Sequence, residues 1–296
     1  MKVFYHADND GKCAGYWVKT LNELTDNFAD EYIKINYGMD FPFESIGKDE
    51  IVYIVDYSIS PEEMDRLLDI TKNVIWIDHH KSAIEKYNDY DKEIAGLRYD
   101  GVAGCMLTYV YLKYIKTGEH FDFDKSLIKN APYCTKLIAD YDVWTFEYGY
   151  DTRKFQKGFE LHSHEPTDVI WNTLNSTEDW ETAENAMNYI LANGEAIINY
   201  RKSMMAEYCK NKGFEAMFED YKCFVINMAM VSSDDFVIDN IDDYDILIGF
   251  SYDGESWNYS LRSTKVDCSI LVMKYGGGGH KGAAGFNSNE FVLRKL

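Results

Sequence analysis

The sequence predicts an α/β protein with a parallel-sheet N-terminal domain, a helical connecting segment and a smaller α+β C-terminal domain. In the first half of the chain, short apolar runs alternate with amphipathic stretches, which is typical of parallel strands joined by helices. A polar, helix-like stretch without strand signals follows, and beyond it the pattern changes to short strands. We therefore expect a first domain over residues 1–185, a linker helix over 186–212 and a second domain over 213–296.

Apolar runs mark the strands of the first domain. Residues 3–5 (Val-Phe-Tyr) open the chain, and the runs 51–55 and 74–77 are fully apolar, as expected of strands buried on both faces. Residues 12–21 place apolar side chains on one helical face. Residues 60–63 (Ser-Pro-Glu-Glu) carry the signature of a helix start, with Ser at the cap, Pro at the first position and Glu at the third.

The second domain is predicted to contain short strands and a helix. The strands cover residues 222–228, 245–252 and 256–263, and the helix covers 268–274. A glycine run comes next, and the small residues after it predict the start of another helix, packed beneath the glycine loop.

Composition excludes several classes of function. A net charge of −20 argues against a protein that grips long duplex nucleic acid, because that grip requires a basic face. No apolar run approaches the ~20 residues that cross a bilayer, and the N-terminus lacks a signal-peptide pattern, so we expect a cytoplasmic protein without a membrane partner. The six cysteines form no C-x-x-C pair, which fits reduced thiols better than disulfides or zinc ligands.

Side chains of metal-ligand type follow each of three predicted strands. A single Asp after a strand is usually a helix cap. The carboxyl ends of parallel strands, however, meet at one edge of a sheet. Ligand-type residues at three such ends therefore favour a metal site. A mixed carboxylate and imidazole set suits Mn²⁺ or a similar first-row ion. Asp140 and Asp142 end a further apolar segment and offer one more carboxylate. The strand-end residues are His6, Asp8 and Asp10, then Asp56, then Asp78, His79 and His80.

The glycine run at 276–279, followed by His280, is the most specific single segment. Consecutive glycines expose backbone N–H groups and let a phosphate approach the main chain closely. Arg262, at the end of a predicted strand, can offer a planar fork to a phosphate. From Ser260 onward six Lys or Arg stand against two acidic residues, a local charge of +4. A short anionic substrate fits this segment.

Taken together, these motifs resemble the DHH phosphoesterase family over nearly the whole chain. The motifs are His-Ala-Asp-Asn-Asp-Gly, Asp-His-His, Ile-Ala-Asp-Tyr-Asp-Val-Trp and the glycine run with its histidine, which is similar to the DHH-associated C-terminal domain. The third motif is most similar to the nano-RNase or oligoribonuclease branch.

The resemblance implies a role for each candidate residue. One metal would be held by His6, Asp8 and Asp56, and the other by Asp10, Asp56, His79 and Asp140, with Asp56 shared. Asp140 is preferred to Asp142 because Ile-Ala-Asp matches the family's position. His80 would stabilise charge at the scissile phosphate, and Asp78 would orient a neighbouring ligand. The substrate-binding residues would be Arg262, Ser263, Gly277, Gly278, Gly279 and His280.

The expected function is a two-metal phosphodiesterase that degrades short oligonucleotides to mononucleotides. The cofactors would be two divalent ions, Mn²⁺ first, with Mg²⁺ or Co²⁺ as alternatives. A phosphodiesterase for cyclic or linear dinucleotides, or for cyclic nucleotides, is the closest alternative. A polyphosphate or pyrophosphate hydrolase would need more cations around the glycine run, and a non-catalytic nucleotide-binding regulator would not need a complete ligand set. The oligomeric state is left open, with a homodimer as one alternative.

Overall fold

The computed structural model of the chain describes all residues except 24–30, 120–121, 177–178 and 230. The chain divides into two compact units, Met1–Glu195 and Ala196–Leu296. The division falls inside helix α8 (Trp180–Lys212), which the sequence marks as a helical segment and which contributes residues to both units. Each unit is described by itself.

The first unit is built on a parallel sheet, as the alternating sequence pattern predicts. Its strands, among the described residues, are β1 (Lys2–His6), β2 (Glu31–Ile35), β3 (Val52–Val55), β4 (Val74–Asp78) and β5 (Ala95–Arg98). They lie in the order β2-β1-β3-β4-β5, and each neighbouring pair is parallel. From β1 the chain first adds β2 on one side and then β3 on the other, so the strand order changes direction between β1 and β3. In open α/β sheets, ligands bind at such a point.

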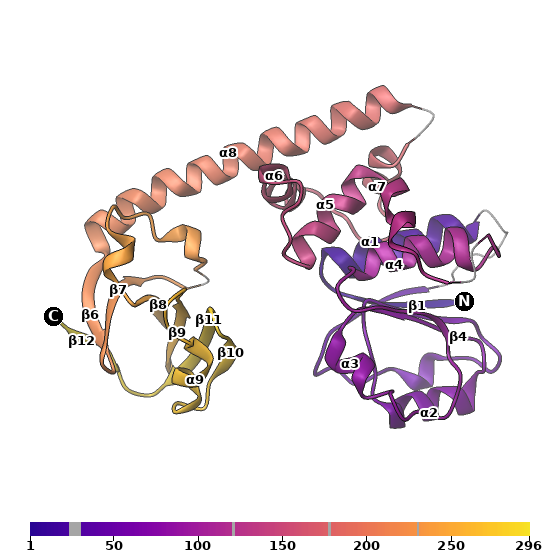
Figure 1. Cartoon of the computed structure of the whole chain (residues 1–296), viewed down its shortest axis with the longest axis horizontal. Helices are drawn as coiled ribbons and strands as arrows, with labels where there is room; N and C mark the ends of the chain where they lie inside the picture. Colours follow the sequence, from indigo (N-terminus) through magenta and orange to yellow (C-terminus); the bar gives the residue numbers. More distant parts are fainter. Residues whose placement is uncertain (24–30, 120–121, 177–178, 230) are drawn as a thin grey trace. The chain divides into compact units, whose positions relative to one another are not determined.

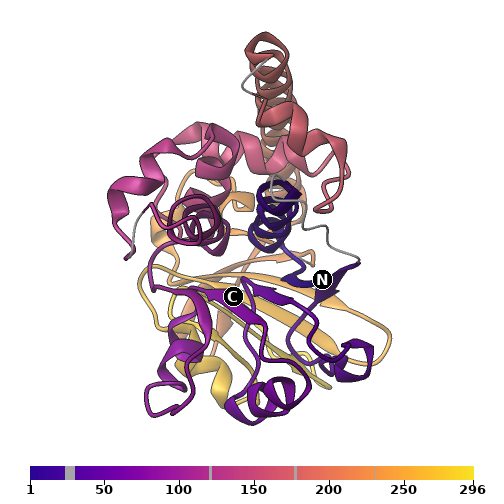
Figure 2. The same ribbon diagram turned by 90° about the vertical axis from the view of Figure 1, so that its right-hand side faces the viewer.

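Helices cover both faces of this sheet (Figures 1 and 2). Helices α1 (Asn9–Glu23) and α4 (Gly104–Val110) lie on one face, and α2 (Pro61–Ile70) and α3 (Lys81–Glu85) lie on the other. Successive residues of a strand point to opposite faces of the sheet and so belong to different hydrophobic cores. Val3 packs with α1, whereas Phe4 packs in the core that includes α2. Both faces are therefore apolar, which explains why β3 is buried along its full length.

Local chemistry sets the start of α2 as the sequence predicts. The Ser60 hydroxyl accepts a bond from the Glu63 backbone N–H at 3.2 Å, and the Glu63 carboxylate accepts from the Ser60 N–H at 2.8 Å. This reciprocal capping box, with Pro61 at the first helical position, satisfies two N–H groups that would otherwise lack partners. Such a cap stabilises a helix by about 1 kcal/mol.

The rest of the first unit is helical. Helices α5 (Tyr133–Asp142), α6 (Tyr150–Phe159) and α7 (Val169–Leu174) extend the core on the α1 face, with short helical turns at Tyr111–Ile115 and Lys125–Asn130. A further short turn, Phe43–Ser45, packs in the core that includes α2. None of the described helices, α8 included, combines the length and apolar character that a bilayer crossing requires. All six cysteines are buried and free, as expected of reduced thiols.

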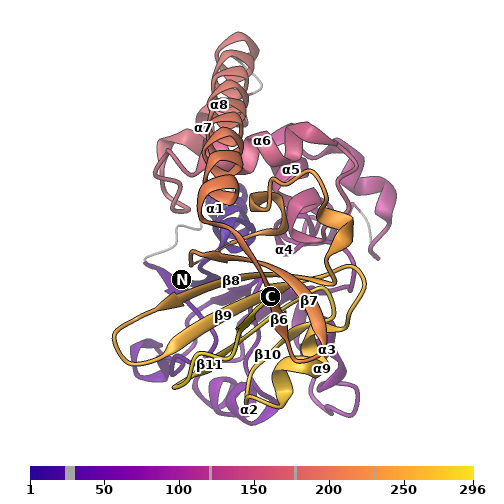
Figure 3. The ribbon, with the colours of Figure 1, turned by 90° about the vertical axis from the view of Figure 1, so that its left-hand side faces the viewer.

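The second unit contains a mixed sheet, whose strands are labelled in Figure 3. The order of its described strands is β10-β11-β9-β8-β7-β6-β12, and the β7–β8 pair is parallel. Helix α9 (Cys268–Met273) packs near β10 and β11. The strands are β6 (Phe214–Phe218), β7 (Tyr221–Asn227), β8 (Ile246–Tyr252), β9 (Trp257–Arg262), β10 (Gly278–His280), β11 (Ala283–Ser288) and β12 (Arg294–Lys295).

The prediction of a helix after the glycine run is wrong. The segment forms a β-hairpin instead, in which β10 pairs antiparallel with β11 across a turn at Lys281 and Gly282. Inside β11 the side chains of Ala284 and Phe286 are buried and their neighbours are less so. This period of two is the pattern of a strand, and small residues alone did not reveal it.

An Arg–carboxylate pair in the second unit connects α8 to the short 3-10 helix Ser233–Asp235. Arg201 Nη2 donates to Asp235 Oδ2 at 2.8 Å, and Asp235 is only 2% exposed. Arg201→Ala should lower the free energy of unfolding by about 2 kcal/mol at neutral pH, since a buried carboxylate loses its charged partner. Lys202→Ala, an exposed neighbour on the same helix, should change it little.

The pH dependence of that effect has a fixed sign. Burial opposes ionisation of Asp235, but hydrogen bonds from Arg201 and Ser232 hold its pKa below the usual value. The pair's contribution is therefore present at neutral pH and is lost as pH falls through the lowered pKa. Urea unfolding at pH 7 should separate the Arg201→Ala variant from the wild type, and the gap should close in strong acid; a constant gap would contradict this assignment.

Candidate metal centre

The predicted metal ligands gather at the carboxyl edge of the first unit's sheet, where the strand order reverses. His6 ends β1, Asp8 and Asp10 lie at the start of α1, and Asp56 follows β3 directly. His79 follows β4. Adjacent parallel strands bring these segments together, as the sequence pattern predicts.

Two groups of possible ligand atoms share Asp56. In the first group, His6 Nδ1 lies 2.6 Å from Asp8 Oδ2 and 3.7 Å from Asp56 Oδ2. In the second group, His79 Nε2 lies 3.2 Å from Asp56 Oδ1, 3.3 Å from Asp142 Oδ2 and 3.7 Å from Asp10 Oδ2. One oxygen of Asp56 thus faces each group, which is the arrangement expected of a bridging carboxylate.

Buried polar atoms in both groups lack hydrogen-bond partners. Among the described residues, both oxygens of Asp56, Oδ2 of Asp142 and Nδ1 of His6 are buried without a hydrogen bond. His6 Nδ1 is close to Asp8, but the geometry is not that of a hydrogen bond. Buried polar atoms are normally paired, so converging atoms without bonds indicate a cation site. The residues fit a two-metal site of oxygen and imidazole ligands.

Asp56 is held in an unusual backbone conformation. Its φ is +53°, in the left-handed region that non-glycine residues rarely adopt, and it is 1% exposed. Strain of this kind costs on the order of 1 kcal/mol and persists at functional sites, where the surrounding structure holds it in place. It turns the carboxylate away from the course of β3 and into the cluster.

The electrostatics of the cluster also favour a cation. Burial, opposed by the proximity of His6, raises the pKa of Asp56 well above its usual value, and neighbouring carboxylates raise it further. Burial and the charge of Asp56 raise the pKa of Asp10 in the same way. Asp56 and Asp8 together raise the pKa of His6 to about 10. Burial and mutual repulsion thus oppose the charged form of Asp10 and Asp56, and a bound cation would relieve both effects.

Asp8 and Asp10 accept hydrogen bonds from backbone N–H groups at the starts of helices. Asp8 caps α1, since its Oδ1 accepts from the Gly11 backbone N–H at 2.9 Å. Asp10 spans to α4, where its two oxygens accept from Gly104 N–H at 2.7 Å and Cys105 N–H at 2.9 Å. Helix N-termini stabilise negative charge, so both carboxylates are placed and partly neutralised before any metal binds.

Two glycines let these segments approach each other. A Cβ on Gly11 would lie 2.2 Å from the His6 carbonyl oxygen, so Gly11 is needed for close packing of α1 on β1. A Cβ on Gly104 would lie 2.7 Å from Asp56 Cβ. Gly104 is a site residue that the sequence reasoning missed, because only the fold brings α4 against β3.

Asp142, and not Asp140, belongs to the cluster. The preference for Asp140 is corrected by its contacts: the two oxygens of Asp140 accept four hydrogen bonds, three from the loop that follows α5 and one from α6. The Asp142 carboxylate points to His79 instead. The four donors to Asp140 are the hydroxyls of Thr145 and Thr152 and the backbone N–H groups of Glu147 and Tyr148.

Asp78 positions the two histidines that follow it. Its Oδ1 lies 2.7 Å from His80 Nδ1 and accepts the His79 backbone N–H at 2.8 Å. A carboxylate on Nδ1 fixes the imidazole so that Nε2 faces outward. His80 is one-third exposed and lies close enough to Asp56 and His79 to be grouped with them. It is placed either to contact a substrate or to join the ligands, and Asp78 is placed to orient it.

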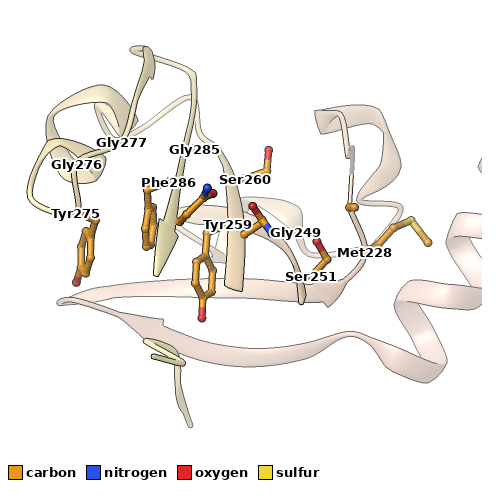
Figure 4. Close-up of a pocket in the computed structure, with 13 residues that line it drawn as sticks. Met228, Gly249, Ser251, Tyr259, Ser260, Tyr275, Gly276, Gly277, Gly285 and Phe286 are labelled. Atoms are coloured by element: carbon orange, nitrogen blue, oxygen red, sulfur yellow. The ribbon is translucent and has the colours of Figure 1, made fainter. Parts of the chain in front are cut away.

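The second unit contains a cavity beside the glycine run (Figure 4). Its volume is about 660 Å³, within the usual size of small-ligand pockets. Tyr275 lies toward one end of the cavity and Met228 toward the other, with the small residues of three strands between them. Strand register aligns these residues in two rows, Gly285–Ser260–Gly249 and Asn287–Asn258–Ser251. Among the described residues, no charged side chain lines the cavity.

The glycines of the run are required for different structural reasons. Gly276, with φ of +72°, and Gly277 donate their N–H groups to Met273 and Val272 and so end α9. A Cβ on Gly277 or Gly279 would collide with β11. Gly278 is the exception: a Cβ there would meet nothing within 4 Å. Gly278 therefore has no packing reason to be glycine.

The other predicted substrate-binding residues are partly engaged within the protein. Arg262 donates to Ser260 Oγ at 2.9 Å and to the carbonyls of Leu261 and Val231 at 2.8 Å. The Ser263 hydroxyl donates to the Asp245 carbonyl and accepts from two backbone N–H groups, so it stabilises a turn. His280 is exposed on β10. Contact of these residues with a substrate stays a prediction.

Comparisons with known proteins agree with this architecture. No protein-family model matches the chain. An uncharacterized protein of Acanthamoeba polyphaga mimivirus is 24% identical over 252 residues, which cover 79% of this chain and 52% of that protein. The chain thus spans about half the length of the curated relative that it matches.

Solved structures of two proteins illustrate the shared fold. The DHH domain of a protein described as a member of a family of ribosomal proteins superposes with a TM-score of 0.54, at 14% identity over 100% of this chain and 82% of that chain. Exonuclease RecJ bound to manganese gives a TM-score of 0.50, at 14% identity over 96% of this chain and 84% of that chain. The first of these structures is described as a DHH domain, and the shared fold confirms the predicted fold class.

Proposed function

We propose that the protein is a metal-dependent phosphoesterase that hydrolyses phosphodiester bonds in short oligonucleotides. The observation that carries the proposal is Asp56: a buried carboxylate in a strained conformation, with both oxygens unbonded and one facing each group of ligands. The similarity to exonuclease RecJ, which is described as bound to manganese, supports the same chemistry. The nano-RNase-like specificity, for very short RNA, is part of this proposal.

The chain's own residues define how such a site would work. His6, Asp8 and Asp56 would hold one divalent ion, and Asp10, Asp56, His79 and Asp142 would hold the other. Bound ions of this kind activate water and neutralise phosphate charge. The Asp78–His80 pair places an imidazole at the edge of the cluster, where it can donate a hydrogen bond to a phosphate oxygen.

The cavity in the second unit favours a nucleotide over a polyphosphate. Its lining consists of hydroxyls, amides and aromatic rings, without a charged side chain among the described residues. A polyphosphate would require cations along its length, whereas a ribose or a base requires neutral donors and acceptors. Gly278, which is exposed and has open space where a Cβ would lie, is the point where a phosphate could approach the backbone.

The main test is hydrolysis of end-labelled RNA of two to about twenty nucleotides with Mn²⁺, beside Mg²⁺ and Co²⁺. Release of mononucleotides, fastest from the shortest RNA, would support the proposal. Cleavage of cyclic or linear dinucleotides alone would move the assignment to a dinucleotide phosphodiesterase. Turnover of polyphosphate without turnover of any nucleotide would exclude the proposed substrate class.

Gly278→Ala separates a binding role from a structural one. An added methyl group has room in the protein, so the melting temperature should stay within about 2 °C of the wild type. If a substrate phosphate contacts this backbone, KM should rise roughly 10-fold with little change in kcat. Gly47→Ala is the matched control, because its Cβ would also make only ordinary contacts. Unchanged KM in Gly278→Ala would remove the glycine run from the substrate site.

A further inference from the structure

A loop of exposed aromatic residues follows directly after Asp142. It covers residues 143–149, between α5 and α6. Within it Trp144 is 63% exposed, so much of a large aromatic side chain is open to solvent. Since Asp142 lies in the metal cluster, Trp144 starts only two residues away from it along the chain.

The backbone of this loop is strained at two bulky residues. Trp144 has φ of +59° and Phe146 has φ of +52°, both in the left-handed region that disfavours large side chains. Two such residues within three positions would relax if the loop were free. Strain that persists in a surface loop indicates that the position of its side chains matters.

The strain is maintained by Asp140, and this gives that residue a role other than metal binding. Its buried carboxylate accepts bonds from Thr145, Glu147 and Tyr148 at 2.6, 2.7 and 3.2 Å, and one from Thr152. Both oxygens of the carboxylate are used, so Asp140 joins the loop to the start of α6. A single buried carboxylate thus holds three residues of the loop in place.

Neighbouring rings fix the orientation of Trp144 without covering it. Tyr141 and Phe146 meet it edge to face, with ring centroids at 5.1 and 4.7 Å. Arg153 lies over the Phe146 ring, 4.8 Å from its centroid. Trp144 is therefore a positioned side chain with a free surface, rather than a mobile one.

We propose that Trp144, two residues along the chain from Asp142 of the metal cluster, is a stacking platform for a nucleobase of the substrate. The proposal rests on the proposed function and narrows its substrate class to molecules that carry a base near the scissile phosphate. Every base offers a π face to an exposed aromatic ring, so such a platform accepts different sequences. A polyphosphate or pyrophosphate offers none.

The test compares the full-length protein with Trp144→Ala, Trp144→Phe and Trp180→Ala. Trp180 is the matched control, because it is 67% exposed and lies on α8, outside the loop. KM and kcat are measured with Mn²⁺ on a ribodinucleotide and on the same phosphodiester with its bases removed. Circular dichroism checks that each variant is folded.

Loss of stacking should appear in KM and only for the substrate with bases. Trp144→Ala should raise KM for the dinucleotide roughly 5- to 150-fold and leave KM for the baseless compound within about 2-fold. Trp144→Phe should keep most of the affinity, and Trp180→Ala should match the wild type. Equal shifts on both compounds, or no shift on either, would overturn the platform while leaving the phosphoesterase intact.

A second readout does not depend on turnover. Binding of a nucleoside monophosphate should quench tryptophan fluorescence in the wild type, and the quenching should vanish in Trp144→Phe but persist in Trp180→Ala. If the wild type hydrolyses no nucleotide, the proposed function fails and this titration still decides about Trp144. Quenching that survives in Trp144→Phe would overturn the inference.

Discussion

Replacing Asp56 by asparagine should abolish hydrolysis and at the same time stabilise the metal-free protein. Activity should fall on the order of 10³-fold or more, because the variant loses the one carboxylate that faces both groups of ligands. Stability without metal should rise by about 1 kcal/mol, since asparagine removes a buried carboxyl group whose oxygens have no hydrogen bond and whose ionisation is opposed by burial and by neighbouring carboxylates. Asparagine also tolerates the left-handed backbone at this position.

The measurement is thermal unfolding with EDTA and with Mn²⁺, beside activity. The wild type should gain stability on addition of Mn²⁺, because the ion binds the folded state, and Asp56→Asn should gain little. Asp56→Ala is the control for strain: it removes the same charge but suits a positive φ poorly, so its stability should be lower than that of the asparagine variant. An active Asp56→Asn protein would exclude a bridging role.

Asp142→Asn and Asp140→Asn should fail in different ways, although the two residues are neighbours in sequence. Asp142→Asn should stay folded, bind Mn²⁺ at least about 10-fold more weakly and lose activity on the order of 10²-fold, because it removes a ligand from the His79 group. Asp140→Asn should lower the free energy of unfolding by roughly 2–3 kcal/mol, because an amide cannot accept all four bonds that the loop and Thr152 of α6 donate.

Calorimetric titration of Mn²⁺ and urea unfolding separate the two outcomes. The expected pattern is weak metal binding with normal stability for Asp142→Asn, and low stability for Asp140→Asn. If Asp140→Asn were the variant with weak metal binding and normal stability, the preference based on Ile-Ala-Asp would stand and our assignment from the structure would fall.

The sequence by itself determined the fold class and the position of the site. Apolar runs with helical stretches between them specify a parallel sheet, and the carboxyl ends of such strands must meet at one edge. His6, Asp8, Asp10, Asp56 and His79 could be placed together for that reason alone. The cap at Ser60–Glu63 was equally predictable, because all of its hydrogen bonds lie within one turn.

The tertiary structure decided what depends on direction and on distant partners. Asp140 and Asp142 are two residues apart on a helix of 3.6 residues per turn, so they point to nearly opposite sides, and only packing shows which side faces the cluster. Gly104 became a site residue because the fold sets α4 against Asp56. The positive φ of Asp56, Trp144 and Phe146 likewise depends on how the folded chain packs around these residues, for the loop on the buried Asp140 carboxylate, which a pattern of residue types does not encode.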